Sequence, residues 1–185
     1  TRACNEEVLA RVDDQMYGLA KTWKGYLGYD FVGGGSDFAT AYFATAKFFE
    51  LCGSLNCLND SEDWCHINYF LKDTDHIGTF FVANTRSPSF DRLQDSIRVA
   101  CELRKHVAVI TDGEPELFPE NAVVFRTPKA QAGWMSPLMQ HIPMDFVAAY
   151  IACFRNTGAF RQDSPIHQRD AACARFRQSK IEVVK

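Results

Sequence analysis

The chain has 185 residues, of which 46% are hydrophobic and 23% charged, a composition that suits one globular domain with a buried core. Its net charge of -3 at pH 7, without a long basic run, argues against nucleic acid as the main partner. No apolar stretch approaches the ~20 residues of a membrane helix, and the polar N-terminus is not a signal peptide, so we expect a cytoplasmic protein without membrane partners.

The first half of the chain alternates predicted helices and strands. Apolar residues at helical spacing predict a helix over 5–27, with Gly28 as its stop. A short buried strand is expected over 29–33, followed by a helix over 36–53 that has Ser36 as its N-cap. Strands are then expected over 55–59 and 76–85, and the second is continuously apolar, as in parallel strands buried on both faces.

The second half continues the alternation. Ser87 as an N-cap before Pro88 predicts the start of a helix over 87–105. Strands are expected over 106–112 and 121–128. A long apolar helix follows over 135–158, with Pro143 marking either a kink or a late start. Residues 159–185 show little apolar periodicity and are expected to form a tail.

This alternation indicates βαβ units. It predicts an α/β fold: a three-layer αβα sandwich around a mainly parallel five-stranded sheet. Residues 1–28 are expected to pack as a helix on a domain formed by 29–158, with the tail after it. Ligands of such sheets bind at the carboxyl ends of the strands, so chemistry is expected in the loops after Val32, Asn84 and Thr111.

The glycine-rich turn Gly33–Gly34–Gly35 precedes the second predicted helix. It departs from the dinucleotide fingerprint because Phe38 occupies the third glycine position, and no Gly-Lys-Ser/Thr follows as in a P-loop. Glycines permit close backbone approach, and a helix N-terminus offers N–H groups to an anion or polar ligand. A plain strand-to-helix turn explains the same residues, so both interpretations stay open, and no cofactor is predicted.

The cysteines are odd in number, widely scattered and without a CxxC pair. This pattern predicts free thiols in a reducing compartment rather than a disulfide framework or a metal site. The seven are Cys4, Cys52, Cys57, Cys65, Cys101, Cys153 and Cys173.

Four segments, taken together, resemble a sugar isomerase (SIS) domain. The turn and helix VGGGSDFATAYFATAKFFELCG carry Lys47 and Glu50, and SEDWCHINYF carries His66. The loop FFVANTRSPSF and the last long helix follow in the same order, and RQSKIEVVK places Lys180 near the end. From Tyr29 onward the chain is most similar to the second, C-terminal SIS lobe of glucosamine-6-phosphate synthase and its fructosamine deglycase relatives.

The resemblance implies a flavodoxin-like SIS fold and a phosphorylated sugar or sugar-amine as ligand. It implies isomerisation, or deglycation of a fructosamine 6-phosphate, through an open-chain, enediol-type intermediate. Glu50 matches the proton-shuttling carboxylate, His66 the ring-opening histidine supplied by a neighbouring subunit, and Lys180 a tail lysine that closes over the sugar. The residues expected to bind substrate are Gly34, Gly35, Ser36, Lys47, Thr85 and Ser87.

Two departures from the family pattern affect the expected partners. The loop NTRSPSF lacks the glycine of the family's phosphate loop, and His66 is followed by Ile67 and Asn68 instead of Gly-Pro. We therefore expect a homodimer, or a missing N-terminal SIS lobe, to complete the site. The alternative function is a non-catalytic SIS module that senses a sugar phosphate. A nucleotide-binding or flavodoxin-like domain is a third possibility.

Overall fold

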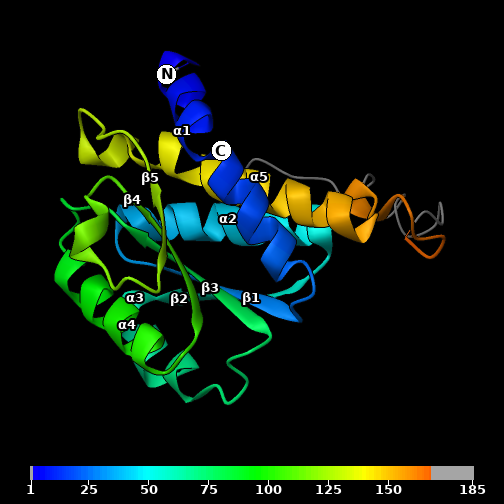
Figure 1. The fold of residues 1–185 in the computed structure, drawn as a ribbon, viewed down its shortest axis with the longest axis horizontal. Helices are drawn as coiled ribbons and strands as arrows, with labels where there is room; N and C mark the ends of the chain where they lie inside the picture. Colours follow the sequence, from blue (N-terminus) through cyan, green and yellow to red (C-terminus); the bar gives the residue numbers. More distant parts are fainter. Residues whose placement is uncertain (1, 168–185) are drawn as a thin grey trace, which may run out of the picture.

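A computed structural model describes residues 2–167 as a three-layer αβα sandwich (Figure 1). The central sheet has five parallel strands in the order β2-β1-β3-β4-β5. This confirms the predicted fold class. The strands are β1 (Gly28–Gly33), β2 (Leu55–Asp60), β3 (Ile77–Ala83), β4 (His106–Thr111) and β5 (Val123–Arg126).

Five α-helices cover the two faces of this sheet (Figure 1). One face carries α1 (Arg2–Trp23), α2 (Ser36–Cys52) and α5 (Pro137–Arg155), and the other carries α3 (Ser61–His66) and α4 (Phe90–Glu102). Short 3-10 turns lie in the connections: η1 (Asn68–Phe70), η2 (Pro115–Leu117), η3 (Gly133–Met135) and η4 (Ala159–Arg161).

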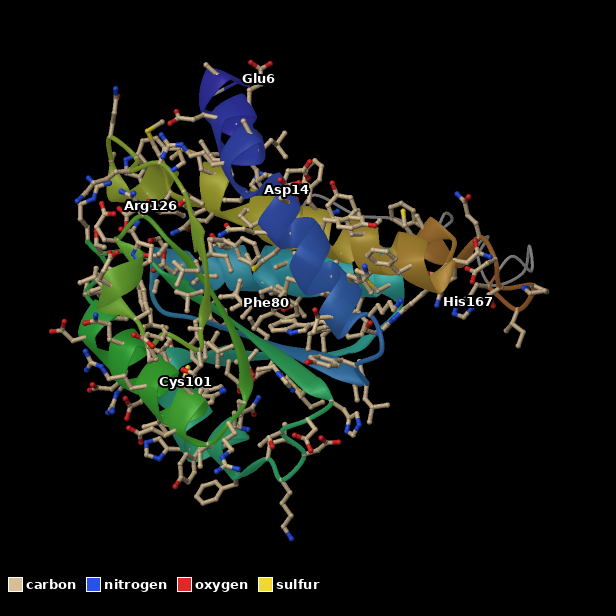
Figure 2. The ribbon with its side chains drawn as sticks, in the orientation of Figure 1. Glu6, Asp14, Phe80, Cys101, Arg126 and His167 are labelled. Carbon is tan, nitrogen blue, oxygen red and sulfur yellow. The ribbon has the colours of Figure 1, made fainter. Side chains whose placement is uncertain are left out.

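An aromatic cluster forms the core under α1, α2 and α5. Phe80 in the middle of β3 is fully buried at its centre (Figure 2). Its ring stacks on Phe31 of β1 with centroids 5.3 Å apart, and meets Phe48 of α2 edge-on at 5.4 Å. Trp23, at the end of α1, contacts the same ring at 5.1 Å. These rings bury large apolar areas, so this cluster holds the helices of this face to the sheet.

On the opposite face of the sheet, the buried carboxylate of Asp30 lies among apolar side chains. Trp64 of α3 is fully buried against Phe81 and donates its indole N–H to Asp30 at 2.8 Å. Asn59 also donates to Asp30, at 3.0 Å. Burial raises the pKa of the Asp30 carboxyl, and the hydrogen bonds oppose that rise. The bonds fix α3, a short helix that hydrophobic periodicity alone did not predict.

Helix starts differ from the predicted ones by a few residues. Ser36 is the first residue of α2, and the N-cap is Gly35, with φ of 58° and no side-chain capping bond. Helix α4 begins at Phe90 with Ser89 as its N-cap, because Ser87 and Pro88 belong to the turn that leaves β3. Pro143 lies inside α5 rather than at its start.

Two glycines offer a matched test of the packing between α1 and the sheet. A Cβ on Gly78 of β3 would lie 2.6 Å from Cζ3 of Trp23, whereas a Cβ on Gly18, exposed on α1, would meet nothing within 4 Å. We expect Gly78→Ala to lower the free energy of unfolding by about 1–3 kcal/mol through overpacking. Gly18→Ala should raise it by about 0.5–1 kcal/mol through helix propensity. Urea denaturation measures both; equal effects of one sign would contradict this packing.

Candidate functional site

The glycine turn after β1 leaves no space for a side chain at Gly33 or Gly34. A Cβ on Gly33 would lie 2.6 Å from the carbonyl oxygen of Asp37, and one on Gly34 would lie 2.5 Å from Oγ of Ser89. Gly35 adopts a left-handed φ of 58°, which favours glycine. Ser87 Oγ donates to the Gly34 carbonyl at 3.5 Å. The structure thus brings Gly34, Gly35, Ser36 and Ser87 together, and their expected role in binding substrate stays a prediction.

A buried carboxylate, Asp37, joins the loops at this edge of the sheet. It lies in the first turn of α2 and is completely buried. It accepts the backbone N–H of Asn84 at 2.9 Å and the side-chain amide of Gln140 at 3.1 Å. Gln140 in turn accepts from Thr40 at 3.0 Å, and Asn84 Nδ2 donates to Ser136 Oγ. One network therefore connects α2, the loop after β3 and the start of α5.

Desolvation raises the pKa of Asp37 to about 6, and the neighbouring Asp112 adds to the rise, while the hydrogen bonds from Asn84 and Gln140 oppose it. The N-terminus of α2 also provides favourable backbone dipoles for a carboxylate at this position. Sequence reasoning missed Asp37. Its signal was an acidic residue in the first turn of an otherwise apolar helix.

The loop after β3 is held by contacts to its neighbours. Thr85 N donates to Asp112 Oδ1 at 2.8 Å, and the Arg86 guanidinium donates to the carbonyls of Ala130 and Gln131. In the described part of the chain, Thr85 Oγ1 and Asp112 Oδ2 are buried without a hydrogen-bond partner. This edge therefore offers hydroxyl and amide groups, while its arginine is engaged with the backbone and its carboxylates repel an anion.

The first N–H groups of α2 are also engaged. Asp37 N donates to the Gly34 carbonyl at 3.1 Å and Phe38 N to the Gly35 carbonyl at 3.3 Å. With a carboxylate buried beside them, these groups provide less anion binding than a free helix N-terminus. The physical chemistry of the turn favours neutral hydroxyls over a phosphate.

Lys47 and Glu50 lie far from this turn. Their ammonium and carboxylate groups form an ion pair at 2.5 Å, with side chains 29% and 34% exposed. Because α2 runs back from the carboxyl edge to the amino edge of the sheet, Glu50 lies about 21 Å along the helix from Ser36. The structure therefore separates Lys47 and Glu50 from Gly34, Gly35 and Ser36 within one chain.

The ion pair has aromatic and imidazole neighbours on the same surface. Lys47 Nζ lies 5.0 Å from the centre of the Phe43 ring, and His141 of α5 meets that ring edge-on at 5.5 Å. His141 Nδ1 is bonded to Asp145 Oδ2 at 2.7 Å. Sequence reasoning did not single out His141 and Asp145, although their i,i+4 spacing on a predicted helix was readable.

His66 lies on the opposite face of the sheet, at the end of α3. Its Nε2 is 3.1 Å from Glu62 Oε1, and Glu62 also pairs with Arg92 of α4 at 2.6 Å. The His66 side chain is 71% exposed. Within one chain it is separated from Glu50 by the sheet, so a shared site requires a second chain. Lys180 lies outside the described residues, and its expected role stays a prediction.

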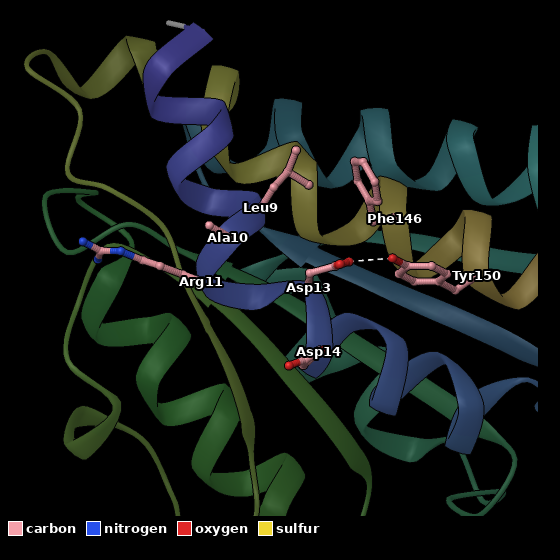
Figure 3. A pocket seen from close by; sticks show the side chains of 7 residues that line it. All are labelled: Leu9, Ala10, Arg11, Asp13, Asp14, Phe146 and Tyr150. Carbon is pink, nitrogen blue, oxygen red and sulfur yellow. Dashed lines mark hydrogen bonds between the residues drawn. The ribbon is translucent and has the colours of Figure 1, made fainter.

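A hollow of about 490 Å³ lies between α1 and α5 (Figure 3). Asp13 accepts a hydrogen bond from Tyr150 there at 2.5 Å, and Asp14 adds a second carboxylate. The guanidinium of Arg11 pairs with Glu7 at 2.5 Å. Two carboxylates and a neutralised arginine make this hollow electrostatically unsuitable for a phosphate.

Within residues 2–167, no group of three or more His, Cys, Asp or Glu side chains is placed to hold a metal ion. Over the same residues, each helix is too short or too polar to span a membrane.

The raised pKa of Asp37 predicts a pH-dependent stability difference from Asp37→Asn. The folded protein binds a proton here near pH 6, whereas a free aspartate does so near its ordinary value of 3.8. The wild type should therefore gain stability relative to the variant as the pH falls from about 7.5 to about 4, by up to about 3 kcal/mol for a shift of about two units. Urea denaturation across this range measures the difference, and a difference independent of pH would contradict the assignment.

No family model matches the sequence, and no curated protein matches it. Solved structures do match. The C-terminal domain of glucosamine-fructose-6-phosphate aminotransferase from Francisella tularensis superposes with a TM-score of 0.77 at 15% identity, over 86% of this chain and 44% of that one. Tagatose-6-phosphate ketose/aldose isomerase from Escherichia coli gives 0.69 at 12% identity, over 85% and 44%.

A third similar structure is the sugar isomerase domain of an RpiR transcription factor from Sphaerobacter thermophilus. Its TM-score is 0.64 at 13% identity, over 95% of this chain and 90% of that one. This chain thus spans about the whole length of the third structure and 44% of the length of the first two. At these identities the likeness concerns the fold, and the chain has the α/β fold of a sugar isomerase (SIS) domain.

Proposed function

We propose that this chain is a phosphosugar-binding SIS domain that provides acid–base residues to a sugar-phosphate isomerase or fructosamine-6-phosphate deglycase. The observation that carries the proposal is the Lys47–Glu50 ion pair, held beside an exposed aromatic ring on a helix of this fold. The names of two similar structures, an aminotransferase of fructose 6-phosphate and a tagatose-6-phosphate isomerase, support the choice of substrate class.

Glu50 is the proposed base. On an open-chain sugar it takes a proton from the carbon next to the carbonyl and returns it to the neighbouring carbon after an enediol forms. Lys47 acts as a positioning residue, because its 2.5 Å contact fixes the carboxylate one helical turn away. The partial exposure of both side chains leaves room for a substrate to approach.

The remainder of the site is proposed to come from a second chain or a second SIS lobe. At the carboxyl edge Arg86 is engaged with backbone carbonyls and Arg126 with Glu114, so we expect a phosphate to need donors from elsewhere. His66 faces away from Glu50, and a dimer in which one subunit presents His66 to the other would bring them together. The 44% coverage of the first two similar structures is compatible with a two-lobe arrangement.

A sensing role is the second candidate. It is favoured by the similarity to the sugar isomerase domain of a transcription factor, which this chain matches over almost its entire length. A sensor binds the sugar phosphate without needing a base, so the two functions differ at Glu50.

Replacement of the base separates these functions. Fructose 6-phosphate is incubated with the protein in D2O, and deuterium at C1 is followed by NMR, while binding is measured by calorimetry. We expect Glu50→Gln to bind with similar affinity and to exchange at least about 100-fold more slowly than the wild type. Glu7→Gln, which removes the carboxylate of a helical ion pair on α1, is the matched control and should exchange normally.

Binding without exchange in the wild type would support the sensor instead. Absence of binding to fructose 6-phosphate, glucosamine 6-phosphate and a glycated amino-acid 6-phosphate would overturn both functions. Tight binding of FMN or NAD would indicate a nucleotide-binding domain.

A further inference from the structure

The surface between α2 and α5 holds five side chains in continuous contact. Glu50 pairs with Lys47, Lys47 lies over Phe43, and Phe43 contacts His141. His141 bonds to Asp145 at 2.7 Å, which completes the row. Phe43 and Glu50 are two helical turns apart, about 10 Å, and side chains on a helix lean toward its N-terminus, so Lys47 and Glu50 lean back toward Phe43.

His141 is oriented as proton-transfer histidines are. An ionised carboxylate only accepts, so Nδ1–H of His141 donates to Asp145, and the second ring nitrogen, Nε2, is left for another partner. The other carboxylate oxygen of Asp145, Oδ1, is buried and has no hydrogen-bond partner among the described residues. The side chains of His141 and Asp145 are only 32% and 24% exposed, so packing restricts their geometry more than in an ion pair on the open surface.

His66 provides an internal comparison, because it forms the same i,i+4 pair with a carboxylate on a helix. That contact is longer, at 3.1 Å, and its two side chains are 71% and 52% exposed. It also lies on the face of the sheet away from Glu50. By contact and by location, His141 is the better-placed imidazole within one chain.

We infer that His141, positioned by Asp145, donates the proton that opens the sugar ring before Glu50 acts, with the sugar lying beside Phe43. This rests on the proposed phosphosugar function. The anomeric hydroxyl releases its proton to water and its oxygen becomes the carbonyl. His141 enters this step as the imidazolium, with protons on both Nδ1 and Nε2. The bond from the anomeric carbon to the ring oxygen breaks, its electron pair takes the proton from Nε2, and the neutral imidazole keeps its Nδ1–H on Asp145. The open-chain sugar then presents its C–H to Glu50.

The test uses one substrate that needs ring opening and one that cannot form a ring. Fructose 6-phosphate is mainly cyclic in water, whereas erythrose 4-phosphate carries its phosphate on the oxygen that would close the ring. Deuterium exchange from D2O next to the carbonyl is measured for both. We expect His141→Gln to slow exchange into fructose 6-phosphate by about 100-fold and to leave erythrose 4-phosphate unchanged. Glu50→Gln should abolish both, and His76→Gln, which removes an exposed histidine paired with Asp73, should leave both within a few-fold of the wild type.

Other outcomes overturn the assignment separately from the proposed function. Loss of exchange in Glu50→Gln but not in His141→Gln would contradict the role of His141 and leave Glu50 as the base. Loss in His66→Gln alone would assign ring opening to the other face. A wild type that exchanges neither substrate would overturn the proposed function, and with it this inference.

A measurement without turnover completes the test. In protein with ¹⁵N-labelled histidine, fructose 6-phosphate should shift the Nε2 signal of His141 and leave that of His76 in place. Asp145→Asn should change the tautomer balance of His141, because the carboxylate acceptor of Nδ1 is gone, while Asp95→Asn, on exposed α4, should not. An unmoved Nε2 signal at saturating fructose 6-phosphate would contradict contact between His141 and the sugar.

Discussion

The parallel pairing of the five strands requires each connecting helix to run back from the carboxyl edge of the sheet to its amino edge. Helix α2 therefore begins at the glycine turn and carries Lys47 and Glu50 to the other end of the domain. The glycine turn and the ion pair are therefore close in the sequence but lie in different regions of the surface. Any site that uses both must draw on more than one copy or lobe.

At the carboxyl edge of the sheet, desolvation of the Asp37 carboxylate is opposed by the hydrogen bonds that this group accepts. Asp37 sits where a parallel α/β domain usually receives its ligand, and its own carboxylate occupies the donors there. An apolar residue at this position would leave the backbone N–H of Asn84 and the side-chain amide of Gln140 without their acceptor. The network thus secures three elements to each other and reduces the capacity of the edge for anions.

Much of the fold was predictable from sequence, because the periods of strands and helices are local properties. The continuously apolar segment before Asn84 became a central strand, and the order of elements gave the sheet its class. Helix α3 was missed because its stability comes from the contact between Trp64 and Asp30, which are 34 residues apart. The observed helix starts differ from the predicted ones where the geometry of the preceding turn, and not the nearest serine in the sequence, determines the N-cap residue.

The candidate site was predictable only in part. Resemblance identified Glu50 and Lys47 as a pair, and the structure places them in contact. The resemblance could not show that His66 and Glu50 lie on opposite faces of the sheet within one chain, since this placement depends on how α3 packs. His141 had a readable partner in Asp145, but its proximity to Phe43 arises from the packing of α5 on α2 and has no signature in the local sequence.

The three tryptophans occupy contrasting surroundings. Trp23 is buried beneath α1 and Trp64 beneath α3, on opposite sides of the sheet, whereas Trp134 in the connection to α5 is 75% exposed. Two of the tryptophans therefore emit from surroundings shielded from water, and the third emits from a hydrated position. If Trp134 is replaced by phenylalanine and one of the other two tryptophans is also removed, a single tryptophan remains in one helical layer. Its fluorescence would then follow the unfolding of that layer alone, so the two layers could be compared.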